Sequence, residues 1–316
     1  IAGTSSIGDV VQFIAYISLL IWPVIAIGWI TNLVQRAAAA MGRINKVFDL
    51  EPEIADSEKT DGTITEISGG LEFRNVSLIY DPARPPILNN LDFSVKPGET
   101  LAIVGATGSG KTSIVNLIAR VYEASGGDVL IDGHPISAVP LDVLRTSIGT
   151  VTQETFLFSM DLADNVRFGR TDANLEQIVE AASLARLHDN VVEFPKGYET
   201  MVGERGVTLS GGQKQRTSIA RAVLREPKIL ILDDSLSAVD TETEEGILEG
   251  LRAIMKERTT ILIAHRISTV QEADNIVVLE EGQIVERGTH DELVDLGGRY
   301  ASTYRRQLLE QELEEL

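Results

Sequence analysis

The sequence predicts an α/β domain, with a parallel sheet covered by helices, preceded by one membrane-spanning helix. Three observations support this prediction. Strand-like and helix-like segments alternate in the last third of the chain, a glycine-rich loop at 105–112 joins a strand to a helix, and an uncharged run occupies Val10–Ile30. Alternating strands and helices are typical of parallel sheets, because each connection has to cross one face of the sheet.

The uncharged run is long enough to cross a bilayer. Its 21 residues would form a helix of roughly 30 Å, the thickness of the hydrocarbon core. The alternatives are a buried core helix and a signal peptide. No basic residue precedes the run and no small-residue cleavage site follows it, which disfavours a signal peptide. Pro23 lies inside the run and predicts a kink.

Flanking charge predicts the orientation of this helix. Asp9 precedes the run, whereas Arg36, Arg43 and Lys46 follow it. Basic residues gather on the cytoplasmic side of membrane helices. We therefore expect a location in the cell membrane, with the C-terminal side of the helix, and everything after it, in the cytoplasm.

Composition divides the chain into four parts. We expect a transmembrane helix with a cytoplasmic extension at 1–50, a polar linker at 51–70, a compact domain at 71–308 and an acidic C-terminal tail at 309–316. The expected strands of the domain are 71–80, 91–95, 100–104, 127–131, 148–151, 229–232, 260–264 and 276–279, and its clearest helices are 175–187, 213–224, 243–255 and 299–316.

Overall charge and cysteine count exclude several classes of function. The chain has 28 basic and 47 acidic residues, a net charge of −19, whereas nucleic-acid partners favour basic surfaces. We therefore expect no nucleic-acid partner. The chain has no cysteine, so disulfides, thiolate metal sites and thiol nucleophiles are excluded.

The glycine-rich loop fits the phosphate-loop pattern G-x-x-x-x-G-K-[ST], with a strand before it and a helix after it. Glycines let backbone N–H groups surround phosphate oxygens, and the N-terminus of the helix adds positive potential. We expect Lys111 to reach the β- and γ-phosphates and Thr112 to hold Mg²⁺. The nucleotide-binding residues of the loop are Gly105, Ala106, Thr107, Gly108, Ser109, Gly110, Lys111 and Thr112.

A second string, Leu-Ser-Gly-Gly-Gln at Leu209–Gln213, resembles the signature of ATP-binding-cassette (ABC) ATPases. Together with the phosphate loop it makes Leu71–Leu308 similar to the nucleotide-binding domain of that superfamily. The resemblance implies a RecA-like parallel-sheet core, an antiparallel β subdomain and a helical subdomain. It also implies ATP and Mg²⁺ as cofactors.

The resemblance assigns further residues. It implies that Tyr80 stacks on adenine, although an ordinary strand-end tyrosine is the alternative, and that Gln153 touches Mg²⁺ or the attacking water. Asp233 follows an apolar strand and resembles the Mg²⁺-organising carboxylate, at the sheet edge where ligands bind. His265 resembles the histidine that contacts the γ-phosphate. The other histidines, His134, His188 and His290, match no catalytic position and are expected on the surface.

The signature implies a dimer. In the family it opens a helix that binds the γ-phosphate held by the opposite subunit, a role that falls here on Ser210, Gly211, Gly212 and Gln213. Ser237–Asp240 resembles the D-loop, which crosses the dimer interface and includes Asp240. Thr200–Gly206 resembles a loop of ABC exporters that relays the nucleotide state to membrane helices. A spanning helix fused to such a domain points to the exporter type, which transports a small molecule or a lipid.

One residue departs from the family pattern. The position after Asp233, where these enzymes carry the glutamate that polarises the attacking water, is Asp234. Its carboxylate is one methylene shorter, and a shift of that size costs about a hundredfold in rate. Either Asp234 is a weaker base in a homodimer, or the chain resembles the impaired half of a bacterial heterodimeric multidrug exporter. The intact signature favours the heterodimer.

Exporter half-transporters carry six spanning helices, and this chain shows one, so we expect a fragment; the alternative is a membrane domain on another chain.

The sequence leaves two other functions as alternatives. A non-transport ABC ATPase of DNA or translation is disfavoured by the apolar run and the acidic charge. A regulatory ABC subunit that binds ATP without hydrolysing it is also compatible with the sequence, because Asp234 replaces the usual glutamate. Drug, lipid and peptide cargoes are all compatible with the sequence.

Overall fold

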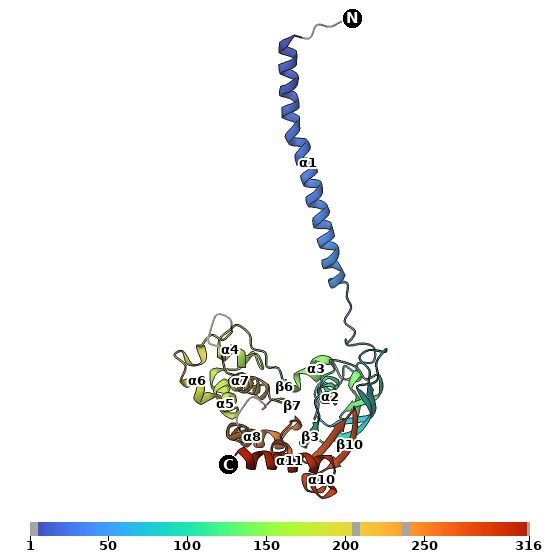
Figure 1. Ribbon diagram of the computed structural model, residues 1–316, viewed down its shortest axis with the longest axis vertical. Coiled ribbons are helices and arrows are strands. Elements are labelled where there is room, and N and C mark those ends of the chain that lie inside the picture. Colours follow the sequence, from blue (N-terminus) through green and yellow to red (C-terminus); the bar gives the residue numbers. More distant parts are fainter. Residues whose placement is uncertain (1–5, 204–208, 236–240, 315–316) are drawn as a thin grey trace. The chain divides into compact units, whose positions relative to one another are not determined.

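The computed structural model describes residues 6–203, 209–235 and 241–314, which fall into two compact units. The first unit ends at Glu53 and the second begins at Ile54. Figure 1 shows a single long helix in the first unit and an α/β body in the second.

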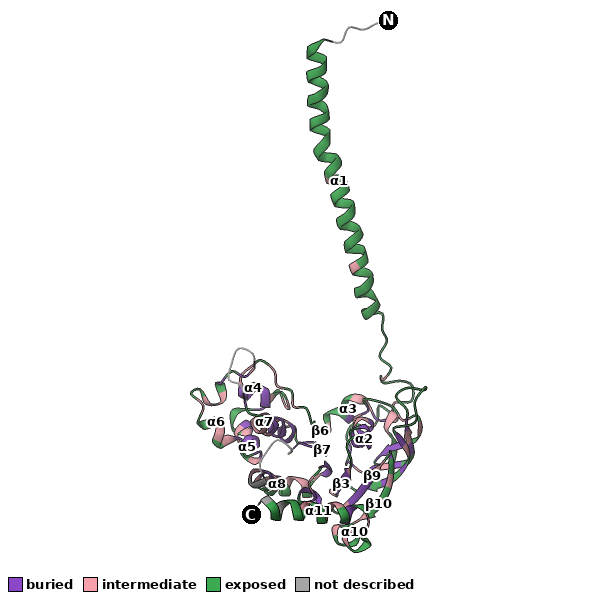
Figure 2. Cartoon of the chain, in the orientation of Figure 1, coloured by how far each residue is buried: buried purple, intermediate pink, exposed green. Residues whose placement is uncertain are grey.

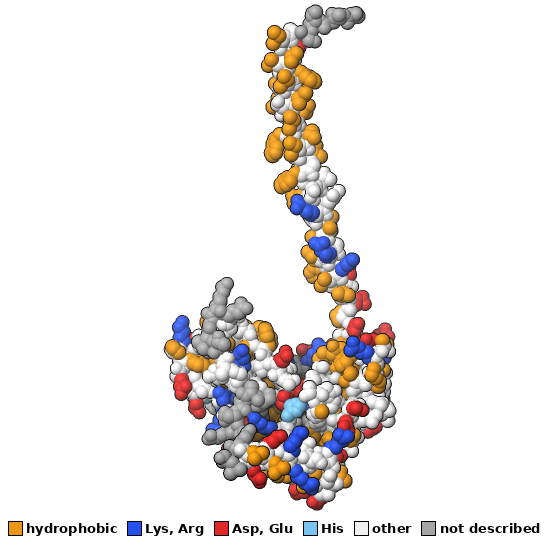
Figure 3. Space-filling model, in the orientation of Figure 1, with side chains coloured by type: hydrophobic (Ala, Val, Ile, Leu, Met, Phe, Trp, Pro, Cys, Tyr) orange, Lys and Arg blue, Asp and Glu red, His pale blue; other side chains and the backbone are white. Residues whose placement is uncertain are grey.

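The first unit is the helix α1 (Ile7–Phe48). Ser6 caps its N-terminus through a capping box with Asp9, and the helix continues through Pro23. None of its residues is buried (Figure 2), and among the described residues it alone is long and apolar enough to cross a membrane. Figure 3 shows hydrophobic side chains around its N-terminal part and basic ones only toward its C-terminal end.

The body is built on a six-stranded sheet in which all strands are parallel to one another except β10, which is antiparallel to β9. The strand order is β10-β9-β3-β8-β7-β6. Because the strands are parallel, the C-terminal ends of β3, β7 and β8 meet at one edge. The strands are β3 (Thr100–Gly105), β6 (Ile148–Val151), β7 (Ile229–Asp233), β8 (Thr259–Ile263), β9 (Asn275–Glu280) and β10 (Gln283–Gly288).

Helices cover both faces of this sheet, which explains why its central strands are mostly apolar. In β7, Leu230 and Leu232 belong to one hydrophobic cluster, whereas Ile229 and Ile231 belong to another. The helices are α2 (Lys111–Ile118), α3 (Leu141–Thr146), α4 (Leu162–Arg167), α5 (Leu175–Leu184), α6 (His188–Val192), α7 (Gly211–Leu224), α8 (Thr241–Lys256), α9 (Ile267–Val270), α10 (His290–Leu296) and α11 (Arg299–Glu314), with 3₁₀ turns at Ile136–Ala138 and Gly197–Glu199.

A second, antiparallel sheet packs beside the first, in the order β2-β1-β4-β5. Its strands are β1 (Leu71–Leu78), β2 (Leu88–Val95), β4 (Gly126–Ile131) and β5 (His134–Pro135). Figure 1 shows α4, α5, α6 and α7 gathered at one side of the body, away from the antiparallel strands. The predicted parallel core, antiparallel subdomain and helical subdomain are therefore confirmed.

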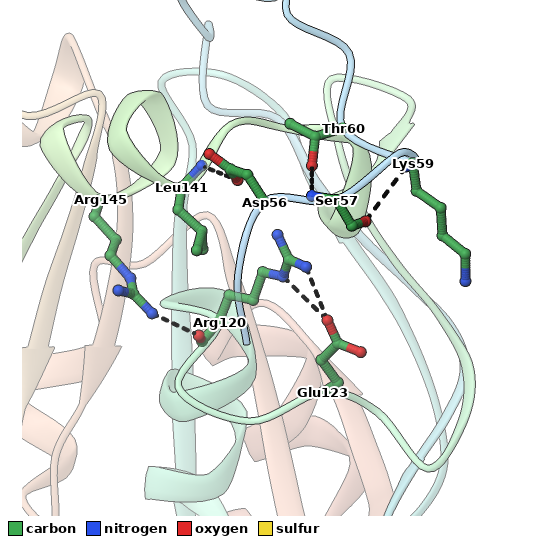
Figure 4. A network of polar contacts seen from close by, with 8 residues as sticks. All are labelled: Asp56, Ser57, Lys59, Thr60, Arg120, Glu123, Leu141 and Arg145. Carbon is green, nitrogen blue, oxygen red and sulfur yellow. Dashed lines mark hydrogen bonds and ion pairs between the residues drawn. The ribbon is translucent and has the colours of Figure 1, made fainter. Parts of the chain in front are cut away.

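The segment before β1, expected as a polar linker, is mostly exposed but is attached to the body at several points. The Asp56 carboxylate accepts a hydrogen bond of 3.0 Å from the backbone N–H of Leu141, at the start of α3 (Figure 4). The Asp61 N–H donates to the carbonyl of Ala138, and Ile67 is buried in the hydrophobic cluster that contains Ile229 and Ile231. We call residues 54–70 the strap.

Replacing Asp56 with alanine is expected to loosen the first part of the strap. The N–H of Leu141 belongs to the first turn of α3 and loses its acceptor, which costs about 1 kcal/mol at a helix start. Trypsin cleavage at the exposed Lys59 should then accelerate about fivefold, since cleavage follows the open population. Asp56→Asn keeps an acceptor oxygen and is the control. Equal acceleration in both variants would contradict the role of the hydrogen bond.

Candidate functional site

The phosphate loop lies between β3 and α2 and needs its glycines. Gly108 and Gly110 adopt φ angles of +83° and +105°, a region that other residues rarely enter. A Cβ on Gly105 would lie 2.3 Å from the backbone oxygen of Leu279, so no side chain fits there. The backbone of the loop is thus free to approach a ligand closely.

The loop closes around the side chain of Lys111. Its Nζ donates to the carbonyl oxygens of Gly105 and Ala106, at 2.8 Å and 3.0 Å. Burial lowers the pKa of Lys111, and the nearby carboxylates of Asp233 and Asp234 oppose that shift. The buried hydroxyl of Ser109 has no hydrogen-bond partner among the described residues. The loop therefore offers a cation and an unsatisfied hydroxyl group.

Asp233 ends the buried strand β7 and is 4 % exposed. Burial raises the pKa of its carboxyl group, and a hydrogen bond from the Thr112 side chain opposes that shift. Thr112 itself is exposed, in the first turn of α2. A threonine hydroxyl and a carboxylate side by side are the kind of hard oxygen donors that Mg²⁺ prefers.

Asp234 brings three of the predicted residues together. Its backbone is in the left-handed region, with φ +47°, and its N–H donates to the carbonyl of Ile263 at the end of β8. One carboxylate oxygen accepts a hydrogen bond of 3.1 Å from Gln153 Nε2 and lies 3.9 Å from His265 Nε2. The ends of β6, β7 and β8 thus place Gln153, Asp234 and His265 around one carboxylate.

Comparison with known proteins agrees with this geometry. Residues 88–237 match the ABC transporter family. The chain is 38% identical to the bacterial protein in the solved structure of an Atm1-family ABC exporter with ATP bound, with a TM-score of 0.84 over 96% of this chain and 53% of that one. This chain carries the ATPase domain of an ABC transporter. The family resemblance seen in the sequence is therefore confirmed.

Several curated relatives of this ABC ATPase domain are bacterial proteins whose names describe transport. The chain is 42% identical over its whole length to the ATP-dependent lipid A-core flippase of Syntrophus aciditrophicus and to the multidrug resistance-like protein MdlA of Escherichia coli, covering 52% and 53% of them. It is 43% identical to the uncharacterized ABC transporter protein YknU of Bacillus subtilis, over 94% of this chain and 51% of that protein. The chain therefore spans about half the length of these relatives.

The signature of the ABC ATPase domain lies at the start of α7. The Ser210 hydroxyl accepts a 3.2 Å hydrogen bond from the N–H of Gln213, and the Gln213 side chain accepts one of 2.9 Å from the N–H of Ser210. Ser210 and Gly211 are exposed, and Gly212 is half-buried. Within the described residues, no hydrogen bond joins this segment to the phosphate loop.

Tyr80 follows β1, and its hydroxyl donates a 3.1 Å hydrogen bond to Ser113 in the first turn of α2. The ring also meets that of Tyr122 edge-on, with centroids 4.7 Å apart, and Tyr80 is 44 % exposed. Tyr80 is thus held beside the helix that the phosphate loop opens. Nothing in the sequence singles out Ser113, because a serine at that place has no signal of its own.

Asp240, with the D-loop Ser237–Asp240, lies outside the described residues, as does part of the Thr200–Gly206 loop. Of the histidines expected on the surface, His134 is exposed, but the expectation is wrong for His188 and His290. Both are half-buried, and their Nδ1 atoms lie 3.0 Å and 2.8 Å from the hydroxyls of Tyr198 and Tyr300.

Proposed function

We propose that this chain is the ATP-binding and ATP-hydrolysing part of an ABC exporter half-subunit in the cell membrane, with its ATPase domain in the cytoplasm. ATP-driven pairing of two such domains would drive export of a small molecule or lipid. The observation that carries the proposal is the convergence of Gln153 and His265 on the Asp234 carboxylate, beside Asp233 and the phosphate loop. The names of the flippase and multidrug relatives support the class of cargo.

A Mg²⁺ ion would be held by Thr112, Asp233 and Gln153. The fit rests on their oxygen donors, because the Thr112 hydroxyl already lies beside the Asp233 carboxylate. Gln153 turns its Nε2 to Asp234, so its amide oxygen is the end left for a metal. When bound, the ion would neutralise phosphate charge that develops during hydrolysis.

Each residue around the ATP would have a separate role. Tyr80 would stack on the adenine, and the backbone of Gly105–Thr112, with Lys111, would bind the phosphates. Asp234 would orient and deprotonate the attacking water, and His265 would contact the γ-phosphate. A water near Asp234 would stay aligned because Gln153 fixes the rotation of that carboxylate.

The exposed start of α7 would serve the ATP of a second subunit. Its first N–H groups lie at the positive end of a helix dipole and attract an anion. We propose Ser210, Gly211, Gly212 and Gln213 as γ-phosphate ligands in trans, with Asp240 at the same interface. The partner is a second exporter half-subunit.

A heterodimer is favoured over a homodimer because Asp234 is shorter than glutamate whereas the signature is intact. This chain's own site would then turn over slowly, and its signature would complete the competent site of the partner. A homodimer with Asp234 as an adequate base, and a regulatory subunit without turnover, are the alternatives.

Steady-state ATP hydrolysis in lipid nanodiscs tests the proposal. The complete polypeptide is measured alone and then together with its candidate partner, and Ser210→Trp is compared with the parent. We expect activity only in the pair, and a loss of about a hundredfold with Ser210→Trp, because an indole at the helix start excludes a phosphate. Robust activity of the chain alone would refute the heterodimer. No activity in any combination would favour the regulatory subunit.

A further inference from the structure

The side chain of Gln307, in the C-terminal helix α11, binds the backbone on both sides of residue 266. Its Nε2 donates a 2.7 Å hydrogen bond to the carbonyl of His265, and its Oε1 accepts one of 2.8 Å from the N–H of Ile267. One amide group therefore forms two hydrogen bonds to the turn that carries His265.

Both ends of this amide are required. Ile267 is the first residue of α9, so its N–H has no acceptor within the helix and needs one from outside. The carbonyl of His265 needs a donor. A glutamate at 307 would satisfy the N–H but would turn a second oxygen toward the carbonyl of His265, so only an amide matches this turn.

The helix that carries Gln307 is itself fixed. Tyr300 is 1 % exposed within the core, and its N–H donates a 3.0 Å hydrogen bond to the Glu286 carboxylate. Gln307 follows Tyr300 by seven residues, two helical turns, and therefore lies on the same face of α11. An anchored helix face thus presents Gln307 to the turn.

A second element holds the turn from another side. Glu244, 4 % exposed in α8, forms an ion pair with Arg266 and accepts a hydrogen bond from Thr269. The backbone of His265 and Ile267 is bound by α11 and the side chain of Arg266 by α8. The imidazole of His265 is 45 % exposed and lies 3.9 Å from Asp234.

We propose that Gln307 is a positioning residue for His265, through which the C-terminal helix keeps the imidazole aimed at the γ-phosphate. The inference rests on the proposed role of His265. Gln307 touches no reacting atom. Its loss lets the carbonyl of His265 rotate, so contact with the third phosphate weakens while contacts with the first two persist.

Nucleotide affinity tests this inference. The dissociation constants of ADP and of a non-hydrolysable ATP analogue are measured, with Mg²⁺, for the complete polypeptide in nanodiscs and for Gln307→Ala and Gln307→Glu. We expect the preference for the analogue over ADP to fall about tenfold, the effect of losing one charge-assisted contact, with ADP affinity unchanged. Arg305→Ala, at an exposed position on the same helix, is the control and should keep the parent ratio.

The same measurement in a His265→Ala background separates the possible failures. If Gln307 acts through His265, Gln307→Glu should have no further effect there. An unchanged ratio in both Gln307 variants, with the parent's unfolding temperature, would overturn the inference, as would an equal loss in the His265→Ala background. If His265→Ala alone leaves the ratio unchanged, the role proposed for His265 is wrong.

Discussion

Replacing Lys111 with methionine is expected to reduce ATP hydrolysis at this chain's own site by about 100- to 1,000-fold, the usual effect of removing a group that stabilises transition-state charge. The Lys111 ammonium is buried in the phosphate loop, and methionine keeps much of its apolar stem but carries no charge. The measurement is single-turnover ATP hydrolysis by the chain with its partner, whose own site is inactivated, with both variants in the same lipid.

Lys196→Met is the matched control, because it removes the same charge. Lys196 is exposed and lies in a loop far from β3 in sequence. Its activity should equal that of the parent. If Lys111→Met retained a tenth or more of that activity, the phosphate loop would contribute little to turnover at this site, and the role proposed for Lys111 would be wrong.

Replacing Asp234 with glutamate is expected to raise hydrolysis at this chain's own site about 10- to 100-fold, if the short carboxylate is the limiting defect. The extra methylene extends the carboxylate toward a bound water, and a misplacement of about 1 Å is worth up to about a hundredfold. Single-turnover hydrolysis, with the partner's site inactivated, isolates the relevant site.

Asp234→Asn, which keeps the shape but cannot take a proton, should lower the same rate. An unchanged rate with Asp234→Glu would mean that the partner's signature, or the geometry around His265, also limits this site. The left-handed backbone at Asp234 is easier for aspartate than for glutamate, so the glutamate variant should also be checked for its unfolding temperature.

The sequence predicts the sheet because its central strands are buried on both faces and are therefore mostly apolar. Each strand expected at 100–104, 148–151, 229–232, 260–264 and 276–279 is present within one residue at either end. Short, mostly apolar runs of this kind are typical of strands in a covered parallel sheet.

The two hairpin strands β5 and β10 were not predicted. The turn before β10 consists of Glu281 and Gly282, both with positive φ, and glutamate is an uncommon choice for the first of these places. Asp132-Gly133 before β5 is a common hairpin pair, but β5 has only two residues and no alternation to detect.

The candidate site was predictable where chemistry uses short, contiguous strings. The phosphate loop, the signature and the carboxylates after β7 are of this kind. The contacts of Ser113 and Gln307 were not predictable, because each joins segments distant along the chain through an ordinary polar side chain. Each contact depends on where the backbone of the distant segment lies, and no local sequence pattern specifies that position.

The hydrogen bonds between Lys111 and the backbone of the phosphate loop imply a trade-off between folding and function. The ammonium loses water when the domain folds, before any nucleotide arrives, and two carbonyl oxygens replace only part of that hydration. Folding therefore costs part of the hydration free energy of this ammonium, and a bound phosphate would offset that cost. We therefore expect a bound phosphate to stabilise the domain in part by restoring polar contacts to this ammonium.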